Sequence, residues 1–81
     1  MVTLGSNCKI YQGVTIGAGK GGYPIIGDNV TIYSNSTVCG KIKIGNNVII
    51  GANSFVNTDI PDNAVYAGVP ARFIKNIVDQ G

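Results

Sequence analysis

A glycine-rich segment with one lysine, Gly17 to Gly22, carries the clearest ligand-binding signal in the sequence. Backbone N–H groups in such a segment can approach phosphate oxygens closely, because glycine has no side chain to hold them apart. The segment satisfies the pattern G-x-G-x-x-G, but Tyr23 and Pro24 lead straight back into an aliphatic stretch and no helix is predicted there. Without that helix we reject a Rossmann dinucleotide site. A flexible surface loop and a ligand-binding loop both remain open.

Two small side chains and two basic ones form a second group of candidates. Ser34 and Ala52 are eighteen residues apart and hold the same place in a regular repeat, so we expect them to stack. Arg72 and Lys75 follow Pro70 closely, and a guanidinium or ammonium group can bind a phosphate. Tolerated small residues in a turn and solvated charges on a terminal segment explain the same four residues about as well.

The composition excludes several other kinds of chemistry. The 81 residues include no histidine, and Cys8 and Cys39 lack the spacing of a metal knuckle, so we expect no metal site. A net charge of +2 is too small to indicate a nucleic-acid surface. No apolar run approaches the roughly 20 residues of a membrane span. We therefore expect a cytoplasmic protein that binds neither nucleic acid nor membrane.

A six-residue repeat must build the elements that position these residues. Branched aliphatic residues recur every six positions, with a single ten-residue step, at Leu4, Ile10, Ile16, Ile26, Ile32, Val38, Ile44, Ile50 and Val56. Asn or Gly occupies the corner place of most units, where both tolerate a sharp turn with positive φ. Lys41 and Asp59 are the exceptions. Similar residues return every eighteen positions, which predicts that three units close one coil.

The predicted fold is an all-β parallel β-helix of about three coils over residues 1–60, with a loop insertion at 17–25. Residues 61–81 form an exit segment and tail, in which 70–79 are either a short helix or extended against the coils. Cys8 and Cys39 fall on different faces, so we expect no disulfide. The first coil has no polar cap, which suggests a shortened form of a longer protein or a cap from another chain. The small size and the low charged fraction of 12% predict partner subunits.

The repeat and its ending resemble the hexapeptide-repeat acyltransferases. The stretch from Asp59 to Arg72, with its Gly-Val-Pro-Ala-Arg core, is similar to the segment with which these enzymes leave a left-handed β-helix. The resemblance covers residues 4–75 and is closest to serine acetyltransferases, which insert a similar glycine-rich loop at the same point. It implies a left-handed helix and a homotrimer that binds acetyl-CoA in the groove between two subunits, without a metal.

The resemblance also implies roles for individual residues. The cofactor residues would be Gly17, Ala18, Gly19 and Lys20 in the loop, Ser34 and Ala52 on stacked corners, and Arg72 and Lys75 near the 3′-phosphate. Tyr23 stands where serine acetyltransferases have a histidine and is a weak candidate for the acceptor side. The general base of the family, a histidine about one coil before Ile10, has no counterpart in this chain. No residue is therefore assigned as catalytic.

The function implied is acetyl transfer from acetyl-CoA to a hydroxyl of a small acceptor, either serine or a sugar. A sugar or capsular-polysaccharide O-acetyltransferase is one alternative, because fold does not determine the acceptor. A non-catalytic trimeric scaffold, or a truncated fragment that binds coenzyme A, is the other alternative, and the absence of histidine favours it. A hexapeptide-type carbonic anhydrase is excluded because its zinc needs three histidine ligands.

Overall fold

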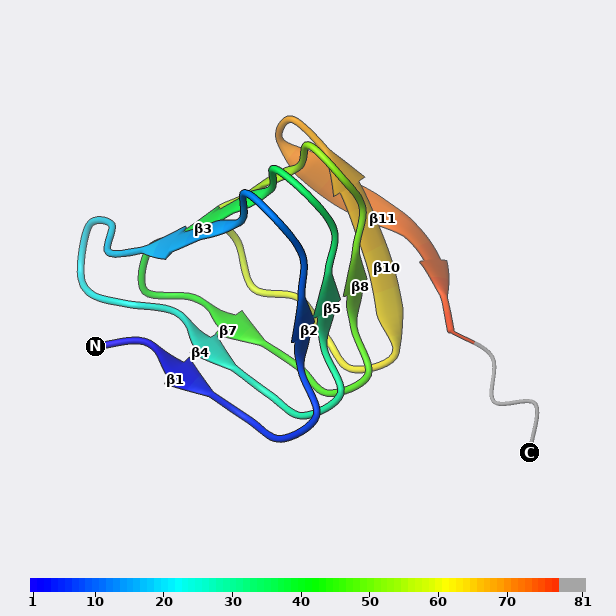
Figure 1. Ribbon diagram of the computed structural model, residues 1–81, viewed down its shortest axis with the longest axis horizontal. Helices are drawn as coiled ribbons and strands as arrows, with labels where there is room; N and C mark the ends of the chain where they lie inside the picture. Colours follow the sequence, from blue (N-terminus) through cyan, green and yellow to red (C-terminus); the bar gives the residue numbers. More distant parts are fainter. Residues whose placement is uncertain (78–81) are drawn as a thin grey trace.

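The computed structural model describes residues 1–77, which form a triangular prism of stacked coils (Figure 1). Each complete coil contributes one short strand to each of three faces. Face A contains β1 (Thr3–Leu4), β4 (Ile25–Ile26) and β7 (Lys43–Ile44). Face B contains β2 (Lys9–Ile10), β5 (Thr31–Ile32), β8 (Ile49–Ile50), β10 (Ala64–Gly68) and β11 (Ala71–Asn76). Face C contains β3 (Thr15–Gly17), β6 (Thr37–Cys39) and β9 (Phe55–Val56).

The strands stack in the register that the aliphatic repeat predicts. Ile10 pairs with Ile32 and Ile32 with Ile50 on face B. On face A the same eighteen-residue step joins Ile26 to Ile44. Branched side chains suit this narrow interior, where they pack on the pleated backbone of the next coil. The core consists of Ile26, Val30, Ile32, Val38, Ile42, Ile44, Val48, Ile50, Val56, Ile60 and Ala64. The predicted all-β, left-handed parallel β-helix is confirmed.

Two of the three corners turn where the sequence predicts. Asn29 and Asn53 lie on these corners with φ of 58° and 57°, a conformation that asparagine tolerates better than most residues. The prediction is wrong at the third corner, between faces C and A, where Gly19 does not adopt a positive φ. Gly40 turns instead with φ of 100°, and the Ile42 N–H closes this turn by donating to the Gly40 carbonyl at 2.9 Å. In the second coil the turn therefore comes one residue before Lys41, the expected corner place.

A partial fourth coil covers one end of the prism. Ile60 bridges to Ile44 on face A, and β10 then pairs in parallel with β8 on face B. Strand β11 turns back and pairs antiparallel with β10. The prism therefore has about four turns where about three were expected. Residues 71–76 are an extended strand, so of the two conformations predicted for 70–79 the extended one is found there and not the short helix. Residues 78 and 79 lie outside the described residues.

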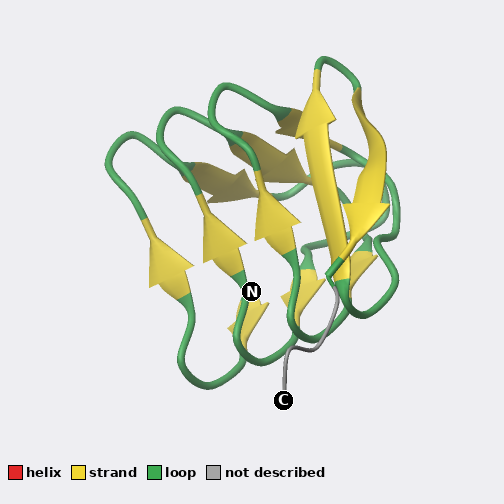
Figure 2. Ribbon diagram, turned by 90° about the vertical axis from the view of Figure 1, so that its right-hand side faces the viewer, coloured by secondary structure: helices red, strands yellow, loops and turns green. Residues whose placement is uncertain are grey.

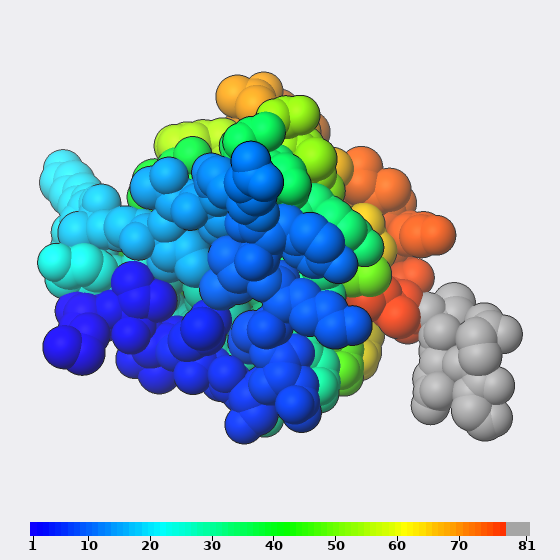
Figure 3. Space-filling model, viewed as in Figure 1, coloured from blue at the N-terminus to red at the C-terminus, as the bar shows by residue number. Residues whose placement is uncertain are grey.

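The opposite end of the prism is open. The first coil faces the viewer in Figure 3, and its inward residues Leu4 and Ile10 are 47% and 41% exposed. Their counterparts one coil along, Ile26 and Ile32, are 2% and 0% exposed. The expected uncovered apolar edge is thus present. Both cysteines are free thiols, also as expected. Residues 1–77 contain no helix of the length and hydropathy needed to cross a membrane.

Candidate functional site

The inserted loop folds into a small hairpin at the corner between faces C and A, at the left of Figure 1. The Gly19 N–H donates to the Gly22 carbonyl at 2.9 Å and the Gly22 N–H donates to the Gly19 carbonyl at 3.2 Å. Gly21 and Gly22 have φ of 94° and 145°, values that side-chain-bearing residues rarely adopt. The glycines therefore fix the hairpin and place Lys20 at its exposed tip.

A pocket of about 320 Å³ lies beside this hairpin. Its lining comes from the loop and from two successive coils: Gly19, Lys20, Cys39, Gly40, Lys41, Ile42, Phe55 and Asn57. A Cβ on Gly19 would lie 2.7 Å from the Cα of Gly40, so the loop can reach the corner only with glycine at this position. Lys20 and Lys41 are both exposed at the pocket. Their ammonium groups favour an anionic ligand.

Ser34 and Ala52 lie one coil apart on the corner between faces B and C. The Asn53 N–H donates to the Ser34 carbonyl at 3.0 Å, and the Asn35 N–H donates to the Gln12 carbonyl at 3.1 Å. These bonds stack the turns of three coils directly on one another. In the second and third coils the corner therefore presents two short side chains, Ser34 and Ala52, in a row parallel to the prism axis, where an extended ligand could contact backbone. Gln12 holds the same place in the first coil.

Two buried serines join this corner to the C-terminal hairpin. The hydroxyls of Ser36 and Ser54 each donate to the Gly51 carbonyl at 2.7 Å. The Ser54 hydroxyl also accepts the N–H of Gly68 at 3.1 Å, and the Ser36 hydroxyl accepts the N–H of Ser54 at the same distance. Every hydroxyl thus has a donor and an acceptor partner, as buried polar groups require. The network holds the end of β10 against the corner.

Arg72 lies beside the row of small residues. It pairs with Ala67 on β10, and a Cβ on Gly51 would lie 2.9 Å from the Cβ of Ala67. Gly51 directly precedes Ala52, so the exposed Arg72 is next to the last turn of the corner. Lys75 instead pairs with Val65, at the far end of β11 from this turn.

The predicted site residues therefore form one group and two separate positions. Ser34, Ala52 and Arg72 share the corner between faces B and C. Residues 17–20 lie at the other edge of face C, and Lys75 lies at the far end of β11. Tyr23 follows the loop hairpin and is 45% exposed, next to the buried Pro24. A single copy of the chain does not bring these positions into one pocket.

Several residues around these sites were not predicted from the sequence. Cys39, Phe55 and Asn57 line the loop pocket because the coils stack, which no local motif reveals. Ser36 and Ser54 carried a usable signal, since each places a hydroxyl where the repeat otherwise puts an aliphatic side chain. A polar residue at an inward position predicts a hydrogen-bonded network.

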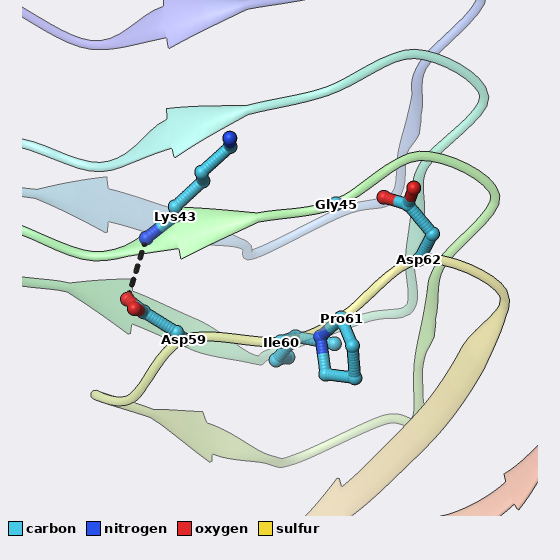
Figure 4. A pocket seen from close by; sticks show the side chains of 6 residues that line it. All are labelled: Lys43, Gly45, Asp59, Ile60, Pro61 and Asp62. Atoms are coloured by element: carbon cyan, nitrogen blue, oxygen red, sulfur yellow. Dashed lines mark hydrogen bonds between the residues drawn. The ribbon is translucent and has the colours of Figure 1, made fainter.

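A second pocket, of about 390 Å³, lies at the covered end of face A and is lined by Lys43, Gly45, Asp59, Ile60, Pro61 and Asp62 (Figure 4). Its two carboxylates lie on either side of Ile60 and Pro61. Asp59 accepts the backbone N–H of Lys43 at 2.9 Å, and Asp62 accepts that of Asn46 at 2.7 Å. Both carboxylates thus cap backbone groups of the coil before. Among residues 1–77 no three His, Cys, Asp or Glu side chains are grouped to hold a metal ion.

Known proteins share both the repeat and the fold. Residues 23–58 match the family model for the bacterial transferase hexapeptide (six repeats). A serine acetyltransferase of Staphylococcus aureus (strain Mu50 / ATCC 700699) is 46% identical over 78 residues, covering 90% of this chain and 36% of the relative. The crystal structure of Neisseria gonorrhoeae serine acetyltransferase has a TM-score of 0.91 at 38% identity, covering 98% of this chain and 32% of that one. A serine acetyltransferase in complex with CoA has a TM-score of 0.79 at 37% identity, covering 90% and 33%.

The repeat and the stacked coils are similar to those of bacterial transferase hexapeptide proteins, whose family model matches residues 23–58. Over nearly its whole length it is similar to serine acetyltransferases, and the resemblance inferred from the sequence is confirmed. The chain spans 36% of the length of the Staphylococcus aureus relative.

Proposed function

We propose that this chain is the cofactor-binding β-helix of an acetyl-CoA-dependent O-acetyltransferase of the serine acetyltransferase type. The observation that carries the proposal is the row formed by Ser34 and Ala52, which leads to the exposed Arg72 guanidinium. A row of short side chains lets an extended ligand approach the backbone closely, and a planar guanidinium is suited to a terminal phosphate. The similarity to a serine acetyltransferase solved with CoA supports the same assignment.

When bound, acetyl-CoA supplies an acyl group on a thioester. Ser34 and Ala52 contact the extended arm of the cofactor, and Arg72 binds its 3′-phosphate. The loop residues Gly17, Ala18, Gly19 and Lys20 border the cofactor from a neighbouring subunit of a homotrimer, because the loop lies at the other edge of face C. Lys75 has no part in this arrangement, since it lies at the far end of β11. The proposed location is cytoplasmic.

Transfer to an acceptor breaks the acyl C–S bond, forms an ester C–O bond and moves the hydroxyl proton to a base. None of the 81 residues is a histidine, so we assign no base in this chain. Tyr23, which is 45% exposed after the loop, lies on the acceptor side, where its hydroxyl donates a hydrogen bond. The acceptor is a small molecule with a hydroxyl group, either serine or a sugar.

Calorimetric titration with coenzyme A and with dephospho-coenzyme A, which lacks the 3′-phosphate, tests the cofactor site. We expect the 3′-phosphate to tighten binding by about tenfold, and Arg72→Gln to abolish that difference, because a charge-assisted hydrogen bond is lost. Lys75→Gln is the matched control and leaves binding of both ligands unchanged. If Lys75→Gln, and not Arg72→Gln, removes the preference, the phosphate is bound at the other end of β11.

A non-catalytic scaffold is the second candidate, favoured by the absence of histidine from the 81 residues. The same titration separates the two functions. A scaffold gives no heat of binding with coenzyme A or acetyl-CoA at millimolar concentration, whereas a cofactor-binding helix binds both. Analytical ultracentrifugation measures the proposed trimer directly.

A further inference from the structure

The outer surface of face B lies mostly outside the proposed cofactor site, which reaches this face only at Arg72 on β11. The strands of face B lie side by side and face the viewer in Figure 2. One line of register partners crosses all five strands, in the order Lys9, Thr31, Ile49, Val65 and Lys75. Because inward residues such as Ile10 and Ile32 alternate with this line, these five side chains point outward.

Two tyrosines stand beside that line on the outer surface. Tyr11 and Tyr33 directly follow the inward residues of β2 and β5, and their ring centroids lie 5.0 Å apart at an interplanar angle of 31°. They remain 45% and 40% exposed. Single exposed aromatic residues are common, but a stacked pair fixed by the register of two coils forms a rigid apolar platform.

The charges on face B are of one sign. Lys9 begins the line and Lys75 ends it, Arg72 on β11 adds a third exposed cation, and the five strands contain no Asp or Glu. Four gaps between strands separate the two lysines by about 19 Å. A ligand that crosses the face along this line meets an ammonium group at each end and an apolar, aromatic centre between them.

The charge of this face argues against a second copy of the chain as its occupant. Lys9, Arg72 and Lys75 lie on its strands and no Asp or Glu does, so two copies of the face would bring cations against cations. A narrow anionic ligand that extends along the line fits the face better.

We propose that face B binds an acidic oligosaccharide, a short chain of pyranose rings that carry carboxylates. The C–H groups on one side of a pyranose ring are weakly positive and pack on the negative ring face that the stacked Tyr11–Tyr33 pair leaves open to solvent. Carboxylates on the flanking sugars pair with Lys9 and Lys75. Binding itself does not depend on the proposed function. The assignment of this glycan as the acetyl acceptor does rest on it, because only then does a sugar hydroxyl receive the acetyl group.

Titration with tetragalacturonate tests the proposal, with neutral maltotetraose as the uncharged comparison. We expect the acidic glycan to bind more tightly by about tenfold. Tyr33→Ala weakens binding by about tenfold and Tyr33→Phe retains it, because the ring and not the hydroxyl makes the contact. Lys75→Gln weakens binding by about fivefold, as expected for one solvent-exposed ion pair. Lys75→Gln leaves coenzyme A binding unchanged, so this variant separates the two sites.

Circular dichroism confirms that each variant is folded before it is titrated. Equal affinity for the neutral glycan, or an unchanged affinity in Tyr33→Ala, would overturn the proposal. So would tighter binding of a single-stranded oligonucleotide, or dissociation of the oligomer by Tyr33→Ala, since face B would then be a nucleic-acid surface or a subunit interface. Failure of glycan binding with normal coenzyme A binding rejects this inference alone. The opposite result rejects the cofactor site alone.

Discussion

The two ends of the prism contain the same kinds of residue in the same register but differ in burial. Ile10 in the first coil is 41% exposed, whereas Ile32, its partner in the second coil, is 0% exposed. At the other end, the partial fourth coil and the β10–β11 hairpin cover the third coil, where Ile50 is also 0% exposed. An aliphatic side chain in this repeat is therefore buried by the next coil as much as by its own.

One ladder of side-chain hydrogen bonds links the two ends. At the covered end Asp62 accepts the backbone N–H of Asn46, as Asn46 accepts that of Asp28 and Asp28 that of Ser6. Each bond runs from one coil to the next on the same corner. Stability along the prism is thus a sum of interfaces between neighbours, as in other solenoids.

Truncating an aliphatic residue in a middle coil should have the largest effect. Ile32→Ala should lower the free energy of unfolding by about 2–5 kcal/mol, because it leaves a cavity between two coils. Ile10→Ala should cost about half as much, since its side chain is already partly exposed to water. Urea denaturation followed by circular dichroism measures both losses. Equal losses would mean that the first coil is covered in solution.

Removing a buried hydroxyl at the covered end should have an intermediate effect. Ser54→Ala should lower the free energy of unfolding by about 1–3 kcal/mol, because the Gly68 N–H loses its partner. Ser34→Ala on the same corner is the matched control, since that half-buried side chain takes no part in the network. Thermal denaturation compares the two variants. A loss of the same size in both would show that the corner, and not the hairpin contact, is responsible.

The smallest effect on stability is expected at Asp62, an exposed residue at the covered end whose carboxylate accepts a backbone N–H. Asp62→Ala removes the acceptor for the Asn46 N–H and should cost less than about 1 kcal/mol, because water can replace it. Asp62→Asn keeps an acceptor oxygen and should therefore retain most of the stability that Asp62→Ala loses. Amide hydrogen exchange at Asn46 reports the bond directly, and it should speed up in Asp62→Ala only. An unchanged exchange rate in that variant would show that the Asp62 carboxylate does not protect the Asn46 N–H.

The fold could be predicted from the sequence because one spacing determines it. The spacing of the aliphatic residues predicted the strand register from Leu4 to Val56. Asparagines such as Asn29 predicted the turns at two of the three corners. The turn at Gly40 could not be predicted, since it depends on how the insertion packs against that corner. Strand β11 was also undecided, because its apolar spacing suits both a helix and an edge strand, and only pairing with β10 selects the strand.

The sequence identified the candidate site residues, but it did not fully determine which of them lie together. Ser34 and Ala52 could be placed on one corner because they are separated by one coil length. Whether Arg72 or Lys75 lies beside that corner depends on the pairing of β11 with β10, which the sequence does not specify. The tyrosine pair on face B is likewise a product of stacking between β2 and β5.

The eighteen-residue step from Ile26 to Ile44 also determines how this molecule can change in length. Adding or deleting eighteen residues moves everything beyond by one coil along the axis and leaves each side chain on its own face. Adding or deleting six would turn the remainder by a third of a revolution, carrying the hairpin and Arg72 from face B to a neighbouring face. Whole coils can therefore be inserted or deleted without changing which face a side chain lies on, whereas a single six-residue unit changes the face of everything that follows it.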